Sequence, residues 1–230
     1  MDSSIGGKTG VDFNSYKNMV GAFHQPKLVY INLATLKTLD DRLFNSGMSE
    51  IIKHGLIRNK SYYEWIKLHT DGIKNKELNV LEELVLRSCE IKQFVVENDP
   101  KEMGERALLN FGHTAGHAVE KLMDFQLLHG ECVAMGMIVA SYLSYRKGNI
   151  TKAEYFDIKD TLRSFEQPLY VDGLDPESIL TTTKVDKKME AGVIKFILLR
   201  KIGHAYICRD LKDTEILEAI CHITNKEQES

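Results

Sequence analysis

Helical patterns cover most of the chain between residues 46 and 224, and they constrain its fold more than any other feature. In these segments apolar residues recur at helical spacing, and most segments open with Ser, Thr or Asp and close near Gly or Asn. The segments predicted to be helices are 46–58, 61–69, 77–97, 106–123, 129–147, 151–165, 176–183 and 214–224. The sequence therefore predicts a mainly α, multi-helical protein.

Two shorter stretches predict β structure. The apolar, β-branched run at 28–32 (LVYIN) follows Pro26 and predicts a short buried strand near the N-terminus. Residues 193–199 and 204–208, joined by 200–203, predict a small β-hairpin near Val193 and Cys208. We therefore expect a helical body with little sheet.

Charge and apolar patterning exclude several classes of partner. Lys and Arg number 30 against 33 Asp and Glu, and no block of like charge is present, so nucleic acid is not an expected partner. The longest apolar stretch, 132–145, is shorter than the ~20 residues that cross a bilayer, and no basic-then-apolar signal segment opens the chain. We expect no membrane partner and a cytoplasmic location.

The cysteines exclude one kind of metal site. Cys89, Cys132, Cys208 and Cys221 are widely spaced, without a Cys-x-x-Cys pair. This spacing suggests neither a disulfide framework nor a thiolate zinc site. Any metal would need His and carboxylate ligands.

The predicted helix 106–123 carries an unusual polar stripe. Arg106, Asn110, His113 and His117 follow one another at spacings of four, three and four, which would place all of them on one helical face. Glycines at 112 and 116 cost about 1 kcal/mol each relative to Ala, a cost that close approach of a helix or ligand would offset. Two His at i and i+4 can present both imidazoles to one metal or substrate. A solvated face with incidental histidines is the alternative, and the whole stripe favours a site.

Two further polar clusters lie elsewhere. Glu50, Lys53 and His54 share a face among apolar residues, which suits a carboxylate ligand beside a lysine or, alternatively, an ordinary surface ion pair. His129 opens an apolar helix, where the N-terminus would lower its pKa and favour a neutral ligand imidazole. A buried structural histidine is the alternative there.

The glycine-rich opening resembles the end of a phosphate-binding loop without matching one. The pattern G-x-x-x-x-G-K-[ST] requires Gly where Asp2 stands, and no strand precedes it, so a P-loop NTPase is rejected. Backbone amides and Lys8 can still cradle a phosphate or carboxylate, with a flexible turn as the alternative.

Six segments, taken in order, resemble the 3-dehydroquinate synthases, and the resemblance spans nearly the whole chain. They are 2–10 (DSSIGGKTG), 17–26 (KNMVGAFHQP), 47–55 (GMSEIIKHG), 87–92 (RSCEIK), 106–118 (RALLNFGHTAGHA) and 128–131 (LHGE). The run from Asn110 to His117 is the most diagnostic. Tyr16 departs from the family's usual Gly before Lys-Asn, which affects only the local loop shape.

The resemblance implies an enzyme of the shikimate pathway, which leads to chorismate and the aromatic amino acids. Such a lyase cyclises 3-deoxy-D-arabino-heptulosonate 7-phosphate, a sugar acid phosphate, to 3-dehydroquinate with elimination of phosphate, using Zn2+ or Co2+ and a recycled NAD. The resemblance implies metal ligands at Glu50, His113 and His129; catalytic residues at Lys53, Lys92, Arg106, Asn110 and His117; substrate contacts at Lys8, Asn18 and Lys187, with Lys188 as the alternative to Lys187; and an NAD-site edge at Asp2 and Lys8.

The family places a Rossmann-like NAD domain ahead of residues 2–10, and no G-x-G-x-x-G occurs in this chain. We therefore expect residues 1–32 to be the remnant edge of the nucleotide-binding domain and 33–230 to be the helical metal- and substrate-binding domain, inactive by itself. A homodimer is also expected. Three alternatives stay open: a sister sugar-phosphate cyclase, a metal-dependent polyol dehydrogenase, and a non-catalytic zinc-binding fragment. Lys53, Lys92 and Arg106 argue against the dehydrogenase, which has no phosphate to eliminate.

Overall fold

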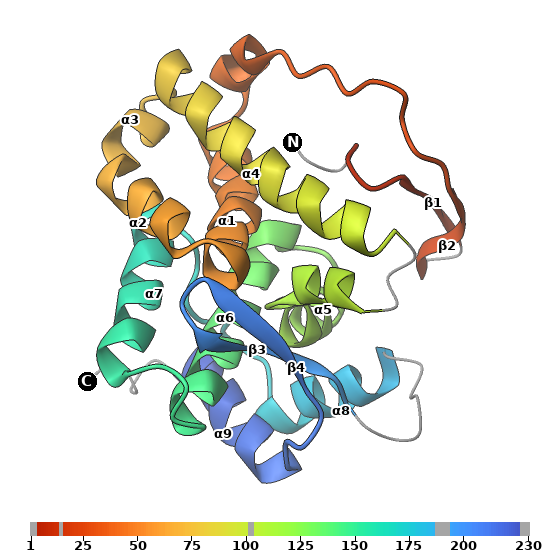
Figure 1. Cartoon of the computed structure of the whole chain (residues 1–230). Coiled ribbons are helices and arrows are strands. Elements are labelled where there is room, and N and C mark those ends of the chain that lie inside the picture. Colours follow the sequence, from red (N-terminus) through yellow and green to blue (C-terminus); the bar gives the residue numbers. More distant parts are fainter. Residues whose placement is uncertain (1–3, 14–15, 101–103, 187–193, 226–230) are drawn as a thin grey trace.

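The computed structural model describes residues 4–13, 16–100, 104–186 and 194–225, and within these ranges the chain is mainly helical with two small antiparallel sheets (Figure 1). The helices are α1 (Asp41–Arg58), α2 (Lys60–Leu68), α3 (Thr70–Lys74), α4 (Leu78–Asn98), α5 (His113–Leu122), α6 (His129–Arg146), α7 (Lys152–Ser164), α8 (Pro176–Asp186) and α9 (Asp213–Thr224), with 3-10 helices η1 (Leu33–Thr38) and η2 (Glu105–Asn110). The strands are β1 (Lys8–Phe13), β2 (Tyr16–Phe23), β3 (Phe196–Lys201) and β4 (His204–Cys208).

The predicted helices are present, with one exception, and most boundaries shift by a residue or two. The largest shift is in α1, which begins at Asp41 rather than at residue 46 because the Asp40 side chain accepts hydrogen bonds from the first backbone amides, Arg42 N and Leu43 N. The short elements η1 and α3 were not predicted, since one or two turns show no periodicity. None of the helices in the described ranges has the length and apolar character that a membrane span requires.

The exception is the segment 106–123, which forms two elements, so the prediction of one continuous helix was wrong. The 3-10 helix η2 ends at Asn110, and Gly112 adopts a left-handed conformation with φ 81° before α5 starts at His113. Glycine reaches this conformation without the steric cost that a Cβ would add, and it ends the helical geometry. Helical spacing therefore aligns His113 with His117, and it does not align either of them with Arg106.

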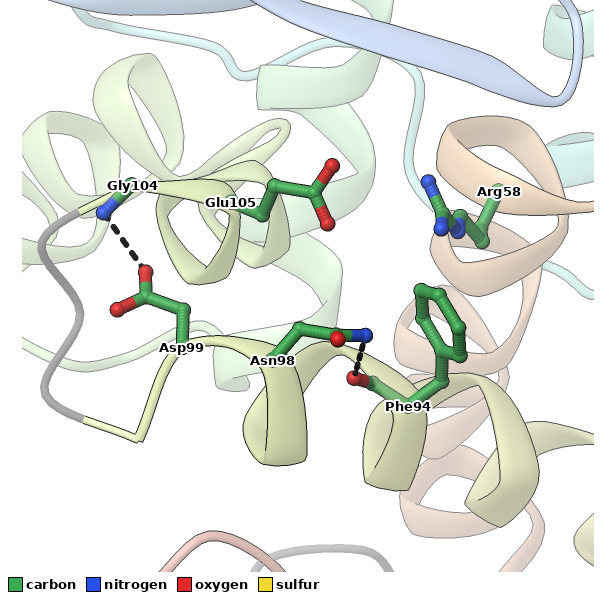
Figure 2. Close-up of a pocket in the computed structure, with 6 residues that line it drawn as sticks. All are labelled: Arg58, Phe94, Asn98, Asp99, Gly104 and Glu105. Atoms are coloured by element: carbon green, nitrogen blue, oxygen red, sulfur yellow. Dashed lines mark hydrogen bonds between the residues drawn. The ribbon is translucent and has the colours of Figure 1, made fainter.

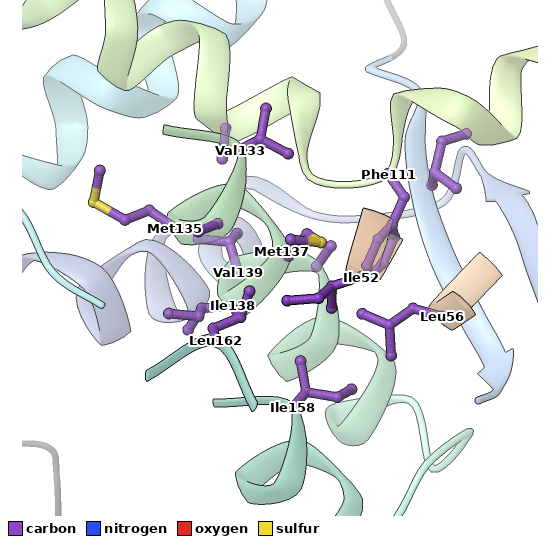
Figure 3. Packing of buried hydrophobic residues seen from close by; sticks show 14 of the residues in the cluster. Ile52, Leu56, Phe111, Val133, Met135, Met137, Ile138, Val139, Ile158 and Leu162 are labelled. Carbon is purple, nitrogen blue, oxygen red and sulfur yellow. The ribbon is translucent and has the colours of Figure 1, made fainter. Parts of the chain in front are cut away.

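Helix α6 forms the centre of the apolar core and packs against α1, α5, α7, α9 and β3 (Figure 3). All residues from 130 to 144 are buried, which is typical of a helix that is apolar on every side. Ile52 and Leu56 of α1 lie on one side of it, and Ile158 and Leu162 of α7 on another. Packing on every side thus sets the position of α6, and with it the position of His129 at the helix start.

Helices α5 and α6 approach each other through glycines. A Cβ built on Gly136 of α6 would lie 1.7 Å from the carbonyl oxygen of Gly112, and one built on Gly116 of α5 would lie 2.7 Å from the carbonyl oxygen of Cys132. The two backbones therefore touch directly, leaving no room for side chains between them. This contact sets the position of the α5 histidines relative to α6.

The C-terminal hairpin is present, with its first strand at Phe196–Lys201 rather than at 193–199, and residue 193 lies outside the described residues. The predicted N-terminal strand is not present. Strands β3 and β4 pair from Phe196↔Cys208 to Lys201↔His204. The predicted strand at 28–32 was wrong: no strand of the described ranges pairs with it, and Leu28 and Tyr30 are 82% and 84% exposed. A strand is stable only with a neighbour to accept its backbone hydrogen bonds. The N-terminal strands are instead β1 and β2, a hairpin that the sequence reasoning missed.

Candidate metal centre

Three helices bring a cluster of imidazoles and a carboxylate together. Helix α1 supplies Glu50 and Lys53, α5 supplies His113 and His117, and α6 supplies His129. Ring nitrogens of the three histidines lie within 4.8 Å of one another, and their ring centroids are 5.1 to 5.7 Å apart. Ligand atoms this close, from three separate elements, form an arrangement that can hold one divalent metal ion.

Glu50 lies against this triad. Its Oε1 is 3.5 Å from His113 Nε2 and 3.7 Å from His129 Nε2, and this buried oxygen accepts no hydrogen bond from the residues described. Its other oxygen, Oε2, accepts a 2.5 Å hydrogen bond from the Nζ of Lys53, whose side chain is 3% exposed. An ammonium this deeply buried must be paired, so Lys53 holds the carboxylate in place on one side and leaves Oε1 directed at the histidines.

Burial, the charge of Lys53 and the carboxylates of Glu50 and Glu120 shift the pKa values in the cluster. Burial opposes ionisation of Glu50, but the charge of Lys53 and the contacts with His129 and His113 hold its pKa well below its usual range. Burial, then the charge of Lys53, lowers the pKa of His113 to about 3. The contacts with Glu120 and Glu50 raise the pKa of His129 to about 9, so the expected lowering by the helix N-terminus was wrong.

Glu120 is a residue of this site that the sequence reasoning missed. It lies on α5, is 4% exposed, and places its Oε2 3.5 Å from His129 Nδ1. The spacing rule that joined His113 to His117 extends to Glu120, three residues further along the same face. That continuation was the available signal.

The other predicted site residues are spread over the surrounding elements. Arg106 is buried and donates hydrogen bonds to the carbonyl oxygens of Gly6, at 2.8 Å, and Pro100, at 2.9 Å. Lys92 is half-buried on α4, Asn110 is half-buried at the end of η2, and Lys8 is exposed on β1. Their roles stay predictions.

Some predicted residues lie partly or wholly outside the described part of the chain. Asp2, Lys187 and its alternative Lys188 are outside the described residues, and for Asn18 only the backbone, in β2, is described. His54, beside Lys53 in sequence, is buried, and its Nδ1 lies 2.8 Å from Ser88 Oγ on α4, which gives it a structural contact.

A surface pocket of about 610 Å³ lies between the ends of α1 and α4 and the start of η2 (Figure 2). It borders Arg106, whose backbone nitrogen donates a 3.0 Å hydrogen bond to Asp99 Oδ2 in the pocket wall. Arg58 lies over the Phe94 ring, 4.4 Å from its centroid, and the Glu105 side chain extends toward it across the pocket. The pocket contains none of the predicted site residues. We assign the chemistry to the histidine cluster, where the buried charges lie.

The fold and the cluster together define a helical protein class with a His and carboxylate centre that could hold a metal ion. A sequence model described as "3-dehydroquinate synthase C-terminal" matches residues 47–189, and one described as "3-dehydroquinate synthase N-terminal" matches residues 1–46. The chain belongs to the 3-dehydroquinate synthase family.

Individual relatives agree with this assignment. The 3-dehydroquinate synthase of Ruminiclostridium cellulolyticum is 44% identical over 223 residues, covering 95% of this chain and 61% of that protein. The one from Acetivibrio thermocellus is 43% identical over 220 residues, with the same coverage of 95% and 61%. The chain thus spans about 61% of the length of the relatives it matches.

Solved structures confirm the expected fold class. A 2-epi-5-epi-valiolone synthase from Streptomyces hygroscopicus, with NAD+ and Zn2+ bound, superposes with a TM-score of 0.88 at 28% identity, covering 95% of this chain and 61% of that one. A 2-deoxy-scyllo-inosose synthase complexed with carbaglucose-6-phosphate, NAD+ and Co2+ gives a TM-score of 0.82 at 25% identity, with coverage of 95% and 63%.

Proposed function

We propose that this chain provides the metal- and substrate-binding part of a 3-dehydroquinate synthase, which converts 3-deoxy-D-arabino-heptulosonate 7-phosphate into 3-dehydroquinate with release of phosphate. The observation that carries the proposal is the cluster of Glu50, Lys53 and three histidines at the meeting point of α1, α5 and α6, in a member of this family. The division into a nucleotide-domain edge at 1–32 and a helical domain at 33–230 is part of the proposal. In support of such a division, the N-terminal family model matches residues 1–46 and the C-terminal family model matches residues 47–189.

The residues present fit a divalent metal, Zn2+ or Co2+. Glu50 Oε1 is a buried acceptor that receives no hydrogen bond from the described residues, and it faces the imidazoles of His113 and His129. We propose these three as the metal ligands; His117 lies in the same cluster and is not one of them. When bound, the metal would supply Lewis-acid chemistry at the substrate's hydroxyls, and NAD would supply hydride transfer.

The chain's own cations suit an anionic substrate. A sugar acid phosphate carries about three negative charges near neutral pH, and each charge-assisted contact contributes about 1.5–3 kcal/mol. Lys53 already holds the Glu50 carboxylate, while Lys8, Lys92 and Arg106 are the cations we assign to the substrate's carboxylate and phosphate. His117, in the triad but outside the proposed ligand set, is the candidate for moving a proton on the substrate.

The similarity to 2-epi-5-epi-valiolone synthase supports one alternative, a sister cyclase that uses a different sugar phosphate. The relatives named 3-dehydroquinate synthase are 40–44% identical, against 28% for that neighbour, which favours the first assignment. Identification of the product by mass spectrometry separates the two.

The test joins this chain to the N-terminal domain of the Ruminiclostridium cellulolyticum enzyme and measures phosphate release with Zn2+ and NAD+. We expect release from the fusion and none from the chain alone. His113→Ala in the fusion should abolish both bound zinc and phosphate release, whereas His204→Ala, an exposed histidine on β4, should change neither. A folded fusion that binds zinc and NAD+ and releases no phosphate from the seven-carbon substrate would refute the proposal.

A homodimer and a cytoplasmic location complete the proposal. Sedimentation of the purified protein checks the first, with a monomer at micromolar concentration as the contrary result. Fractionation of the source cells checks the second.

A further inference from the structure

The His129 side chain has carboxylates on both sides. Its Nε2 lies 3.7 Å from Glu50 Oε1, inside the proposed metal cluster, and its Nδ1 lies 3.5 Å from Glu120 Oε2 on the other side of the ring. We infer that Glu120 is a positioning residue: its carboxylate accepts a hydrogen bond from the Nδ1–H of His129 and so directs the Nε2 lone pair toward the metal. This inference rests on the metal site of the proposed function.

Burial alone does not fix the orientation of the His129 ring. Its side chain is 43% exposed, whereas the side chains of His113 and Glu120 are only 14% and 6% exposed. A half-exposed imidazole that opens a helix can rotate about its side-chain bonds and can present either nitrogen. A buried carboxylate held on the neighbouring helix is a fixed acceptor, and it selects one of these orientations.

The chemistry of the imidazole explains why the choice matters. A neutral imidazole carries one N–H and one lone pair, so a hydrogen bond donated from Nδ1 leaves Nε2 as the ligand atom. A carboxylate on the outer nitrogen of a ligating histidine fixes the ring and makes the inner nitrogen a better donor, and its loss costs about 10–100-fold in metal affinity. The 3.5 Å separation is at the outer limit of a hydrogen bond, so the contact directs the ring without strong pairing.

A purely structural role for Glu120 predicts something different. In that case the carboxylate would only hold α5 against α6, and its removal would lower the free energy of unfolding while leaving the metal's surroundings intact in the folded fraction. The positioning role predicts a loss of metal affinity and altered ligand geometry in protein that is folded.

The experiment compares Glu120→Gln with the parent protein and with Glu218→Gln, a matched loss of one carboxylate. Glu218 on α9 accepts a hydrogen bond from Tyr142, which lies about 20 Å along α6 from His129. Zn2+ affinity is measured by competition with a chromophoric chelator, the visible absorption of the Co2+ form reports the ligand geometry, and urea unfolding in EDTA reports the stability of the protein without metal.

We expect Glu120→Gln to bind Zn2+ about 10–100-fold more weakly than the parent and to change the Co2+ spectrum, and Glu218→Gln to do neither. Zn2+ affinity within twofold of the parent, with an unchanged Co2+ spectrum, overturns the inference. If Glu120→Gln does not fold, Glu120→Asp keeps the charge but shortens the reach, and the same two outcomes apply to it. A parent protein that binds no Zn2+ overturns the proposed function as well, so the two failures are distinguishable.

Discussion

Replacing Gly136 by alanine tests whether the contact between α5 and α6 positions the histidines. The added Cβ would lie 1.7 Å from the Gly112 carbonyl oxygen and 2.8 Å from the Gly116 nitrogen. Both are backbone atoms, which cannot rotate away as a side chain would. The helices must therefore separate.

The structure sets the size of the effect. Because real Cβ contacts are essentially never shorter than 3.0 Å, the 1.7 Å contact must open by about 1.3 Å. Overpacking in a core costs about 1–3 kcal/mol, and a clash with backbone should lie at the upper end of that range. His113 directly follows Gly112, so it would move away from His129 by a similar distance, whereas metal–ligand distances are held to about ±0.2 Å. We expect Zn2+ affinity to fall about tenfold or more.

Urea unfolding in EDTA measures the loss of stability, and competition with a chelator measures Zn2+ affinity. The matched control is Gly47→Ala in α1, where a Cβ would meet nothing within 4 Å among the described residues. Alanine is the better helix former, so this variant should be up to about 1 kcal/mol more stable and bind Zn2+ as the parent does. A Gly136→Ala protein with the parent's stability and Zn2+ affinity would refute the view that this contact holds the site together.

Three further predictions concern other parts of the chain. Burial and the charges of Lys159 and Arg146 lower the pKa of His222 to about 4 from 6.5, so below pH 6.5 the unfolded chain binds a proton that the folded chain does not. The free energy of unfolding should therefore fall as the pH is lowered from 6.5 to 4, by less than about 3 kcal/mol because solvent screens this half-buried group. The fall should be smaller in His222→Gln. Urea unfolding at each pH measures the free energy of unfolding, and an equal fall in both proteins would contradict the prediction. Arg106→Lys removes at least one of the two hydrogen bonds that the guanidinium donates to backbone carbonyls, of which the one to Gly6 is buried, so the protein should lose about 1–3 kcal/mol of stability. Thermal unfolding measures this loss, and an unchanged melting temperature would count against these bonds. Tyr63→Phe removes the 2.8 Å hydrogen bond to Asp157, so the free energy of unfolding should fall by about 1 kcal/mol while Zn2+ affinity stays the same. Scanning calorimetry measures the stability, and a change in Zn2+ affinity would contradict the prediction.

Much of the fold was accessible from local patterns. Caps and apolar periodicity located α4, α6, α7 and α9 to within a residue or two, and turn residues located the β3–β4 hairpin. These signals act over a few neighbouring residues, so they can be read along the chain. Family motifs also pointed to Glu50, His113 and His129, and the structure brings those side chains together, while their role as ligands stays a prediction.

Two of the wrong predictions, the continuous helix 106–123 and the strand 28–32, share one cause: each depended on contacts with a distant part of the chain. The spacing of Arg106 and His113 fits one helical face, but it holds only if the helix is continuous, and the left-handed Gly112 interrupts it where α6 comes into backbone contact. The run at 28–32 has the composition of a strand, yet strand formation depends on a partner elsewhere in the chain.

Most of the helical segments, and the residue types that carry the chemistry, could be predicted from the sequence, because backbone propensity and side-chain chemistry are local properties. The burial of Lys53 against Glu50, the hydrogen bonds from Arg106 to backbone carbonyls and the contact of Glu120 with His129 became known only from the packing of the helices. Each of these depends on how closely two segments approach and on how much water their packing excludes. Burial then sets the energies, because a charge or hydrogen bond removed from water interacts far more strongly with its neighbours than the same group on a solvated surface.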